Sequence, residues 1–346
     1  MPARLLALVA AIAMVVGAIA VRSRIDDDKV RRTTVLRLVC ATEIAAACET
    51  LAADGDAGRV EVTTEAAAVT AGRLLSAQTG AAAARDLDGW LVTAPWPAIV
   101  AEGRGRAALD PLVRAGPALA RSPVVLAVWP ERSAVLARHC RTEGVSWRCL
   151  GDNAGRSWAD LGGPPTWGPL KPGHAAPTTA TGLSVVGAAT AAYFDRADVS
   201  RADLDDDGYR DWLTRLERSI PSRSGAPLED MLLAGPGAFD VVATLEADAA
   251  PLLARSARAE PPQLQYPAPV ATADVVLASV GGRRAAQLAG VVAGRGGRAA
   301  LAGAGWRVEG QRRAPGIGGT PLPPASGLPS PGVLQALRQV VEEITR

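Results

Sequence analysis

The stretch KPGHAAPTTATGLSVVGAATAAYF, residues 171–194, changes abruptly from proline and glycine to a long run of small apolar residues. Pro177 suits the approach to a helix start. Thr178 or Thr179 can cap that start, because a threonine hydroxyl accepts a hydrogen bond from a free N–H group of the first turn. The stretch therefore predicts a helix with a polar beginning, and it raises the question of what that beginning holds.

The residues before this stretch alternate short β-rich runs with alanine-rich runs, which is typical of α/β domains. Parallel strands joined by helical crossovers place their carboxyl ends along one rim, where open sheets of this type bind ligands. We predict a βαβαβ series with strands over residues 35–41, 60–65 and 89–95 and helices between them, the first over residues 44–55.

A second series of elements follows, with strands over residues 122–130, 239–246 and 270–279. Two of these strands divide the chain into an outer and an inner portion. This order predicts a two-lobed α/β clamshell whose crossing strands form a hinge. The predicted lobes are residues 33–120 together with 270–346, and residues 121–269. Further helices are expected over residues 208–219, 282–293 and 333–345.

The amino terminus carries an uncharged apolar run over residues 5–21, followed by a polar linker. The run is near the lower limit for a membrane-spanning helix and slightly long for a signal-peptide core. Ala18-Ile19-Ala20 offers a cleavage site, whereas the basic residues just downstream resist translocation. Residues 1–32 are thus either a signal peptide or a membrane anchor with its linker, and both alternatives export the chain.

The four cysteines form two local pairs, Cys40 with Cys48 and Cys140 with Cys149. An even count at short spacings predicts two disulfides in an exported protein. The alternative is four reduced, buried cysteines. Neither pair has the CxxC spacing of a zinc site, so we expect no metal centre.

Composition and missing motifs exclude several classes of function. The formal net charge is only +2 over 346 residues, which argues against a nucleic-acid partner. Neither a GxSxG motif nor a phosphate-binding GxxxxGK[ST] loop occurs, so we expect neither an enzyme nor a cofactor. An envelope hydrolase using His174 as its base is the catalytic alternative.

The order of several segments resembles the extracytoplasmic solute-binding proteins of ABC transporters, which have the type II periplasmic-binding fold. These segments span residues 35–308 and are LRLVCATEI, GWLVTAPW, RSPVVLAVWPE, WADLG, the opening stretch, FDVVATLEAD and GAGWR. The most similar subset is the actinobacterial group whose domain often precedes a von Willebrand A module. The resemblance implies a small-molecule ligand in a cleft between the lobes, and a partner that is an ABC permease or another membrane protein. A ligand-free interaction or assembly module of the cell envelope is the alternative.

The same resemblance places helix starts and strand ends around that cleft. The helix start, with Thr178, Thr179, Thr181 and Gly182, can receive an anionic group of a solute at its free N–H groups, or the threonines merely cap the helix. Trp96 either stacks on a ligand or is wedged among prolines. Glu43 and Glu246 either pair with a cationic group or are ordinary surface carboxylates. The remaining candidates at strand ends are Thr42 and Pro95.

Overall fold

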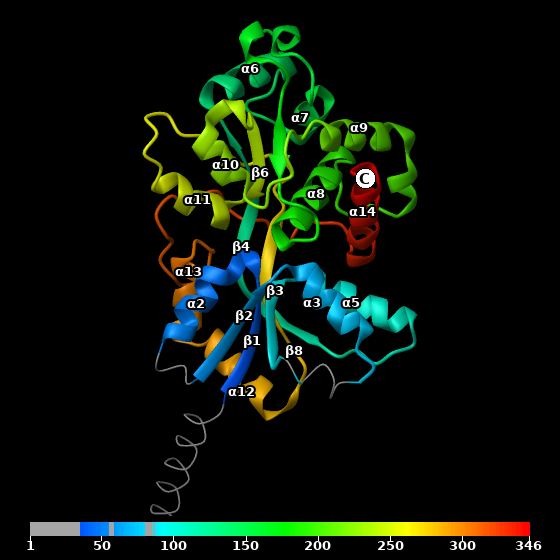
Figure 1. Ribbon diagram of the computed structural model, residues 1–346, viewed down its shortest axis with the longest axis vertical. Helices are drawn as coiled ribbons and strands as arrows, with labels where there is room; N and C mark the ends of the chain where they lie inside the picture. Colours follow the sequence, from blue (N-terminus) through cyan, green and yellow to red (C-terminus); the bar gives the residue numbers. More distant parts are fainter. Residues whose placement is uncertain (1–34, 55–58, 80–84, 86) are drawn as a thin grey trace, which may run out of the picture.

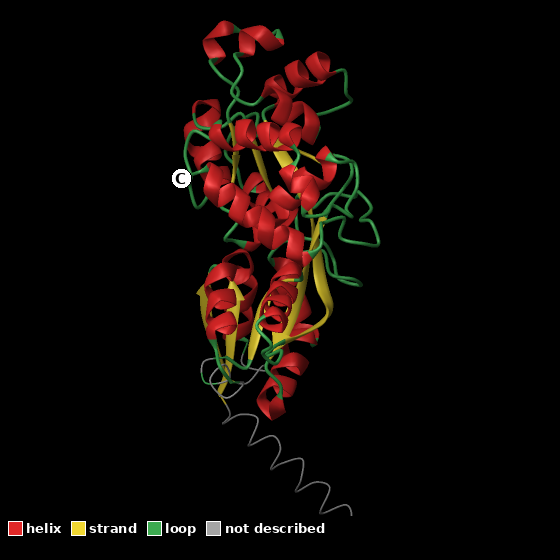
Figure 2. Cartoon of the chain, turned by 90° about the vertical axis from the view of Figure 1, so that its right-hand side faces the viewer, coloured by secondary structure: helices red, strands yellow, loops and turns green. Residues whose placement is uncertain are grey.

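The structure is a computed structural model that describes residues 35–54, 59–79, 85 and 87–346. Its sheet has two parts, one above the other in Figure 1, which we call the lower and the upper half. Strand β4 (Arg114–Val128) is continuous between them. The view turned by 90° shows the same division (Figure 2). Helices lie on both sides of each half (Figures 1 and 2).

The lower half contains the predicted βαβαβ series. Strands β2 (Arg59–Glu65) and β3 (Gly89–Thr93) lie parallel to β1 (Val35–Ala41), one on each side of it. Strand β8 (Thr272–Ser279) is antiparallel to β3 and to the first part of β4. Helices cover both faces (Figure 1): α2 (Ala45–Ala53), α12 (Gly282–Ala293) and α13 (Arg295–Gly303) on one, α3 (Ala67–Ser76) and α5 (Pro95–Arg106) on the other.

The upper half is built around the second part of β4. This part pairs antiparallel with β6 (Val241–Leu245) and β7 (Gln263–Gln265), and β5 (Pro172–His174) lies parallel to β6. The helices of this half are α6 (Pro130–Cys140), α7 (Trp147–Asn153), α8 (Ala180–Tyr193), α9 (Asp207–Arg218), α10 (Pro227–Ala234) and α11 (Glu246–Ala254).

Two chain segments cross between the halves side by side. Pro123 of β4 is in register with Thr272 of β8. The N–H group of Val124 donates to the carbonyl oxygen of Ala271 over 2.8 Å. Backbone groups of the crossing strands are also satisfied by the segments beside them: the N–H group of Thr272 donates to Ser326 and that of Arg121 to Arg307.

Helix α8 is the predicted helix of the opening stretch, and nearly all of it is buried. Its residues are apolar on every side, as expected of a helix enclosed by protein. The last helix, α14 (Pro331–Ile344), contacts α8 and α9 in the upper half and α5 in the lower half. Gly187 lets α14 approach, because a Cβ atom there would lie 2.7 Å from Cδ2 of Leu334.

Both predicted disulfides are confirmed. Cys40–Cys48 joins the end of β1 to α2, and Cys140–Cys149 joins α6 to α7. The four cysteines are therefore oxidised, and the reduced alternative does not hold.

Several element bounds differ from those predicted. The predicted strand over residues 89–95 ends at Thr93, because Pro95 occupies the first turn of α5. Strand β4 begins eight residues earlier than predicted, at Arg114 rather than 122, since its exposed first part pairs with β8.

The predicted apolar segment, residues 5–21, lies outside the described residues. Within the described part of the chain, no helix is both long and apolar enough to cross a membrane.

Candidate ligand-binding site

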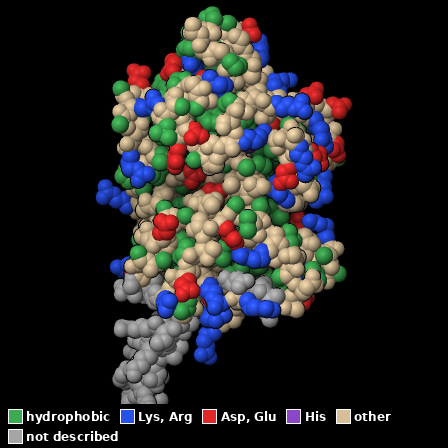
Figure 3. Space-filling model, in the orientation of Figure 1, with side chains coloured by type: hydrophobic (Ala, Val, Ile, Leu, Met, Phe, Trp, Pro, Cys, Tyr) green, Lys and Arg blue, Asp and Glu red, His purple; other side chains and the backbone are tan. Residues whose placement is uncertain are grey.

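A pocket of about 590 Å³ lies between the two halves. The lower half contributes the short helix η1 (Thr42–Ile44), α2 and the end of α13, and the upper half contributes the starts of α8 and α10 together with β6 and α11. Acidic side chains are visible near the middle of the face in Figure 3, where the halves meet. The polar or charged residues that line the pocket are Thr42, Glu43, Glu49, Thr179, Thr181, Glu229, Thr244, Asp248 and Arg255.

The start of α8 forms one wall of the pocket. Thr179, one of the two predicted candidates, is the capping residue, and its hydroxyl accepts a hydrogen bond of 3.0 Å from the N–H group of Gly182. Such a cap contributes about 0.5–2 kcal/mol to stability. Gly182 is required sterically, because a Cβ atom there would lie 2.1 Å from the carbonyl oxygen of Ala176. The N–H group of Thr181, also in the first turn, donates to a partner outside the helix.

That partner is Glu43 of the lower half. Its Oε1 accepts the N–H group of Thr181 over 3.1 Å, so a carboxylate of the protein itself occupies the positive end of the α8 dipole. The disulfide Cys40–Cys48 encloses the segment that carries Glu43. The second carboxylate oxygen, Oε2, is shielded from solvent and has no hydrogen-bond partner among the described residues.

Asp248 on α11 approaches the same threonine from the upper half. Its Oδ2 accepts the hydroxyl of Thr181 over 2.7 Å and that of Thr244 over 3.4 Å. Burial, and then the nearby charge of Glu43, raise the pKa of Asp248 to about 7. Thr181 thus holds two carboxylates, one from each half, at the pocket wall.

Four of the nine predicted ligand-binding residues line the pocket: Thr42, Glu43, Thr179 and Thr181. Thr178 lies next to it and accepts a backbone hydrogen bond from Ala68 over 3.0 Å. Gly182 packs against the backbone of the loop before α8. Pro95 and Trp96 begin α5 instead, and the indole of Trp96 is only 1% exposed.

Glu246 lies in a buried ion pair and does not line the pocket. Its carboxylate is fully buried and accepts two hydrogen bonds from the guanidinium of Arg307, at 2.6 and 2.7 Å. The hydroxyl of Tyr266 and the N–H group of Gly318 also donate to it. This carboxylate therefore joins the start of α11 to the segment before β8, which carries Tyr266, and to the segment after α13, which carries Arg307 and Gly318.

Sequence reasoning missed Asp248, Thr244 and the apolar wall formed by the start of α10. Asp248 follows Glu246 by two residues, so the motif ATLEAD contains both carboxylates. The signal was therefore present, but the pattern did not show which acid faces the pocket. Pro227 in the first turn of α10 was a second available signal.

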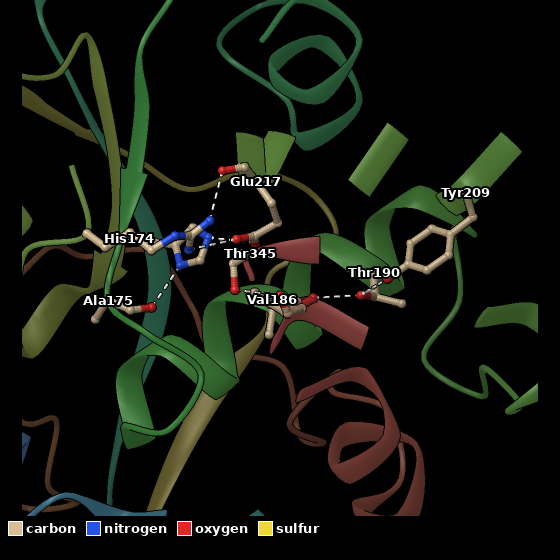
Figure 4. Close-up of polar contacts among 9 residues, drawn as sticks. His174, Ala175, Val186, Thr190, Tyr209, Glu217 and Thr345 are labelled. Carbon is tan, nitrogen blue, oxygen red and sulfur yellow. Dashed lines mark hydrogen bonds and ion pairs between the residues drawn. The ribbon is translucent and has the colours of Figure 1, made fainter. Parts of the chain in front are cut away.

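His174 lies beside the pocket rather than in it. Figure 4 shows its ring between the carbonyl oxygen of Ala175, a pocket-lining residue, and the carboxylate of Glu217 on α9. The same view shows Thr190 of α8 hydrogen-bonded to the hydroxyl of Tyr209, at 2.7 Å. These contacts fix the loop before α8 and α8 itself against α9.

Comparison with known proteins gives structural relatives only. No protein-family model matches the chain, and no curated protein sequence is significantly similar to it. Iron-bound HitA from Pseudomonas aeruginosa superposes with a TM-score of 0.59 at 16% identity, over 90% of this chain and 100% of that one. A periplasmic thiamin binding protein superposes with a TM-score of 0.60 at 9% identity, over 90% of this chain and 96% of that one.

The sulfate-binding protein SubI from Mycobacterium tuberculosis H37Rv gives a TM-score of 0.51 at 15% identity, over 80% of this chain and 88% of that one. At these identities the likeness concerns the fold and not the ligand. The chain therefore shares the fold of periplasmic solute-binding proteins.

Proposed function

We propose that this chain is an exported solute-binding protein that captures a small molecule between two lobes and delivers it to an ABC-type transporter. The observation that carries this proposal is the pocket of about 590 Å³, whose walls come from both halves of the sheet. Its volume is within the usual range for small-molecule sites. Binding proteins of this shape close on a ligand by moving one lobe against the other.

The lobes that we propose are residues 33–120 with 270–346, and residues 121–269. The pairing of Val124 with Ala271 supports a two-strand hinge at this division. Helix α14 contacts helices of both lobes, so it would move against one of them on opening.

Two hydrogen bonds near the pocket join the proposed lobes away from the crossing strands. Ala68 donates to the carbonyl oxygen of Thr178, and Thr181 donates to Glu43. Opening the pocket would break both of them, because each has one partner in each lobe. They support the interpretation of this arrangement as the closed one.

The disulfides support an extracytoplasmic location, since such bonds persist in oxidising compartments. We propose that residues 1–32 are a signal peptide or a membrane anchor, and that the membrane partner is an ABC permease. The resemblance to the actinobacterial group remains part of this proposal, as does the absence of catalytic activity.

The test is a thermal unfolding screen of the full-length protein against amines, amino acids, sugars, carboxylates and oxyanions. A ligand that binds only the folded protein raises its melting temperature by mass action. We expect Ala46→Phe, which places a ring in the pocket, to abolish the shift. Ala53→Phe changes an exposed position of the same helix outside the pocket and should retain it. If no solute stabilises the protein, the ligand-free envelope module is the better explanation.

A further inference from the structure

The carboxylates at the pocket differ from those buried elsewhere in the molecule. Outside the pocket, each fully or almost fully buried acidic side chain among the described residues has a cationic partner. Burying a carboxylate is costly unless a cation and hydrogen bonds compensate for it. The pairs are Asp88 with Arg284 at 2.9 Å, Glu217 with His174 at 2.9 Å, Asp240 with Arg132 at 2.8 Å, and Glu246 with Arg307 at 2.6 Å.

Glu43 and Asp248 have no such partner in the described part of the chain. Their oxygens accept hydrogen bonds from neutral groups of Thr181, Thr244 and Leu245, and Oε2 of Glu43 has no hydrogen-bond partner among the described residues. The two like charges also face the same threonine from opposite halves. The closed arrangement therefore contains a local excess of negative charge that no cation among the described residues pairs with.

The rest of the pocket indicates what would neutralise it. Two further acids, Glu49 and Glu229, line the pocket, against one exposed arginine, Arg255. The start of α8, which could have received an anion, is already occupied by Glu43. An anionic solute would thus meet repulsion where a cation would meet two unpaired carboxylates.

Another part of the pocket lining is apolar. Pro227 and Leu228 begin α10, and Pro251 and Leu252 lie on α11 after Asp248; all four line the same pocket. Burial of an apolar group there is favourable by about 25 cal/mol per Å². The wall therefore suits the hydrocarbon part of an organic molecule better than a hydrated metal ion.

We propose that the pocket binds an organic cation whose ammonium group lies between Glu43 and Asp248 and whose apolar part lies against Leu228 and Leu252. This inference rests on the proposed function and specifies its ligand class. Because one carboxylate comes from each half, the same ammonium group holds the halves together. No group of three or more His, Cys, Asp or Glu side chains among the described residues is placed to hold a metal ion, and the apolar lining favours an organic cation.

The experiment compares solutes of equal shape and different charge. Phenethylamine, phenethyl alcohol and phenylacetate form one set, and hexylamine, hexanol and hexanoate form another. We expect an amine to raise the melting temperature of the full-length protein at about pH 8, above the pKa of Asp248, and the alcohols and acids to have little effect. Glu43→Gln and Asp248→Asn should each weaken amine binding by about tenfold or more in calorimetric titration.

Glu61→Gln is the matched control, because it removes the same charge from an exposed position on β2 outside the pocket. It should bind the amine as the wild type does. Binding of the alcohols or acids in preference to the amines would contradict a cationic ligand and leave the proposed solute-binding function intact. Stabilisation by calcium or manganese ions that is lost in both pocket variants would also overturn it. If none of these solutes, nor any in the broader screen, binds, both proposals fail.

Discussion

Nε2 of His174 lies 2.9 Å from Oε1 of Glu217, within the interior of the upper half. Nδ1 of the same ring lies 2.8 Å from the carbonyl oxygen of Ala175. Both partners are acceptors, so both ring nitrogens must donate, and His174 is an imidazolium. Burial lowers the pKa of His174, but the charge and hydrogen bond of Glu217 outweigh this and raise it above its usual value.

The first prediction concerns the pH dependence of this pair. A histidine whose pKa is raised by folding contributes stability that is present at low pH and is lost as the pH rises through the folded-state pKa. We expect His174→Gln to cost about 1–3 kcal/mol of unfolding free energy at about pH 6 and less at about pH 8. Urea unfolding at the two pH values measures this.

The only other histidine, His139, supplies the control for that measurement. It is exposed at the end of α6, so His139→Gln should leave the unfolding free energy and its pH dependence almost unchanged. An equal effect of the two substitutions would contradict the buried imidazolium.

A second prediction contrasts an unpaired carboxylate with a paired one. The raised pKa of Asp248, about 7, means that its ionisation destabilises the empty protein, and that stability falls as the pH rises toward and through 7. Asp248→Asn should therefore stabilise the ligand-free protein at about pH 8 and reduce this loss. Asp240→Asn should instead cost about 3–5 kcal/mol, because it leaves Arg132 buried without its partner.

Thermal and urea unfolding of both variants without added solute would test the contrast. Stabilisation by Asp240→Asn, or a clear loss on Asp248→Asn at high pH, would show that the charges are balanced differently from what the contacts indicate.

Local patterns predicted much of the fold correctly. Residue periodicity and turn residues predicted the bounds of β1, β2 and α9 to within about two residues, because these bounds depend on local sequence. The cap at Thr179 was also predictable, because it depends only on residues within one helical turn. Cysteine spacing was sufficient for both disulfides, since each closes a short local loop.

The candidate site was only partly predictable, because the direction of a side chain depends on distant partners. Glu246 and Asp248 are only two residues apart. Arg307, which is 61 residues after Glu246, pairs with Glu246 and not with Asp248, and local sequence does not show this choice. Glu43 illustrates the same limit. The sequence placed it after β1, but not against Thr181, which is 138 residues away.

A third prediction concerns the close approach at the start of α8. Gly182→Ala would force the backbone of Ala176 or the helix to move, and we expect a loss of about 1–3 kcal/mol with weaker ligand binding. Gly72 lies within α3, and a Cβ atom there meets nothing within 4 Å, so Gly72→Ala should stabilise the protein by about 0.5–1 kcal/mol. Chemical unfolding of the pair separates steric contact from helix propensity. Equal gains in both would contradict the packing of the loop before α8.

The last prediction uses the two disulfides as a matched pair. They close loops with sequence separations of eight and nine residues, so replacing both cysteines of either pair with alanine should cost a similar free energy, about 2–4 kcal/mol. Only Cys40–Cys48 encloses Thr42 and Glu43 of the pocket, whereas neither Cys140 nor Cys149 lines it. We therefore expect the ligand-induced rise in melting temperature to shrink in the Cys40→Ala, Cys48→Ala variant and to persist in the Cys140→Ala, Cys149→Ala variant. Equal retention of the rise in both variants would mean that β1 and α2 alone hold Glu43 against Thr181, because the covalent bond would then add nothing to its position.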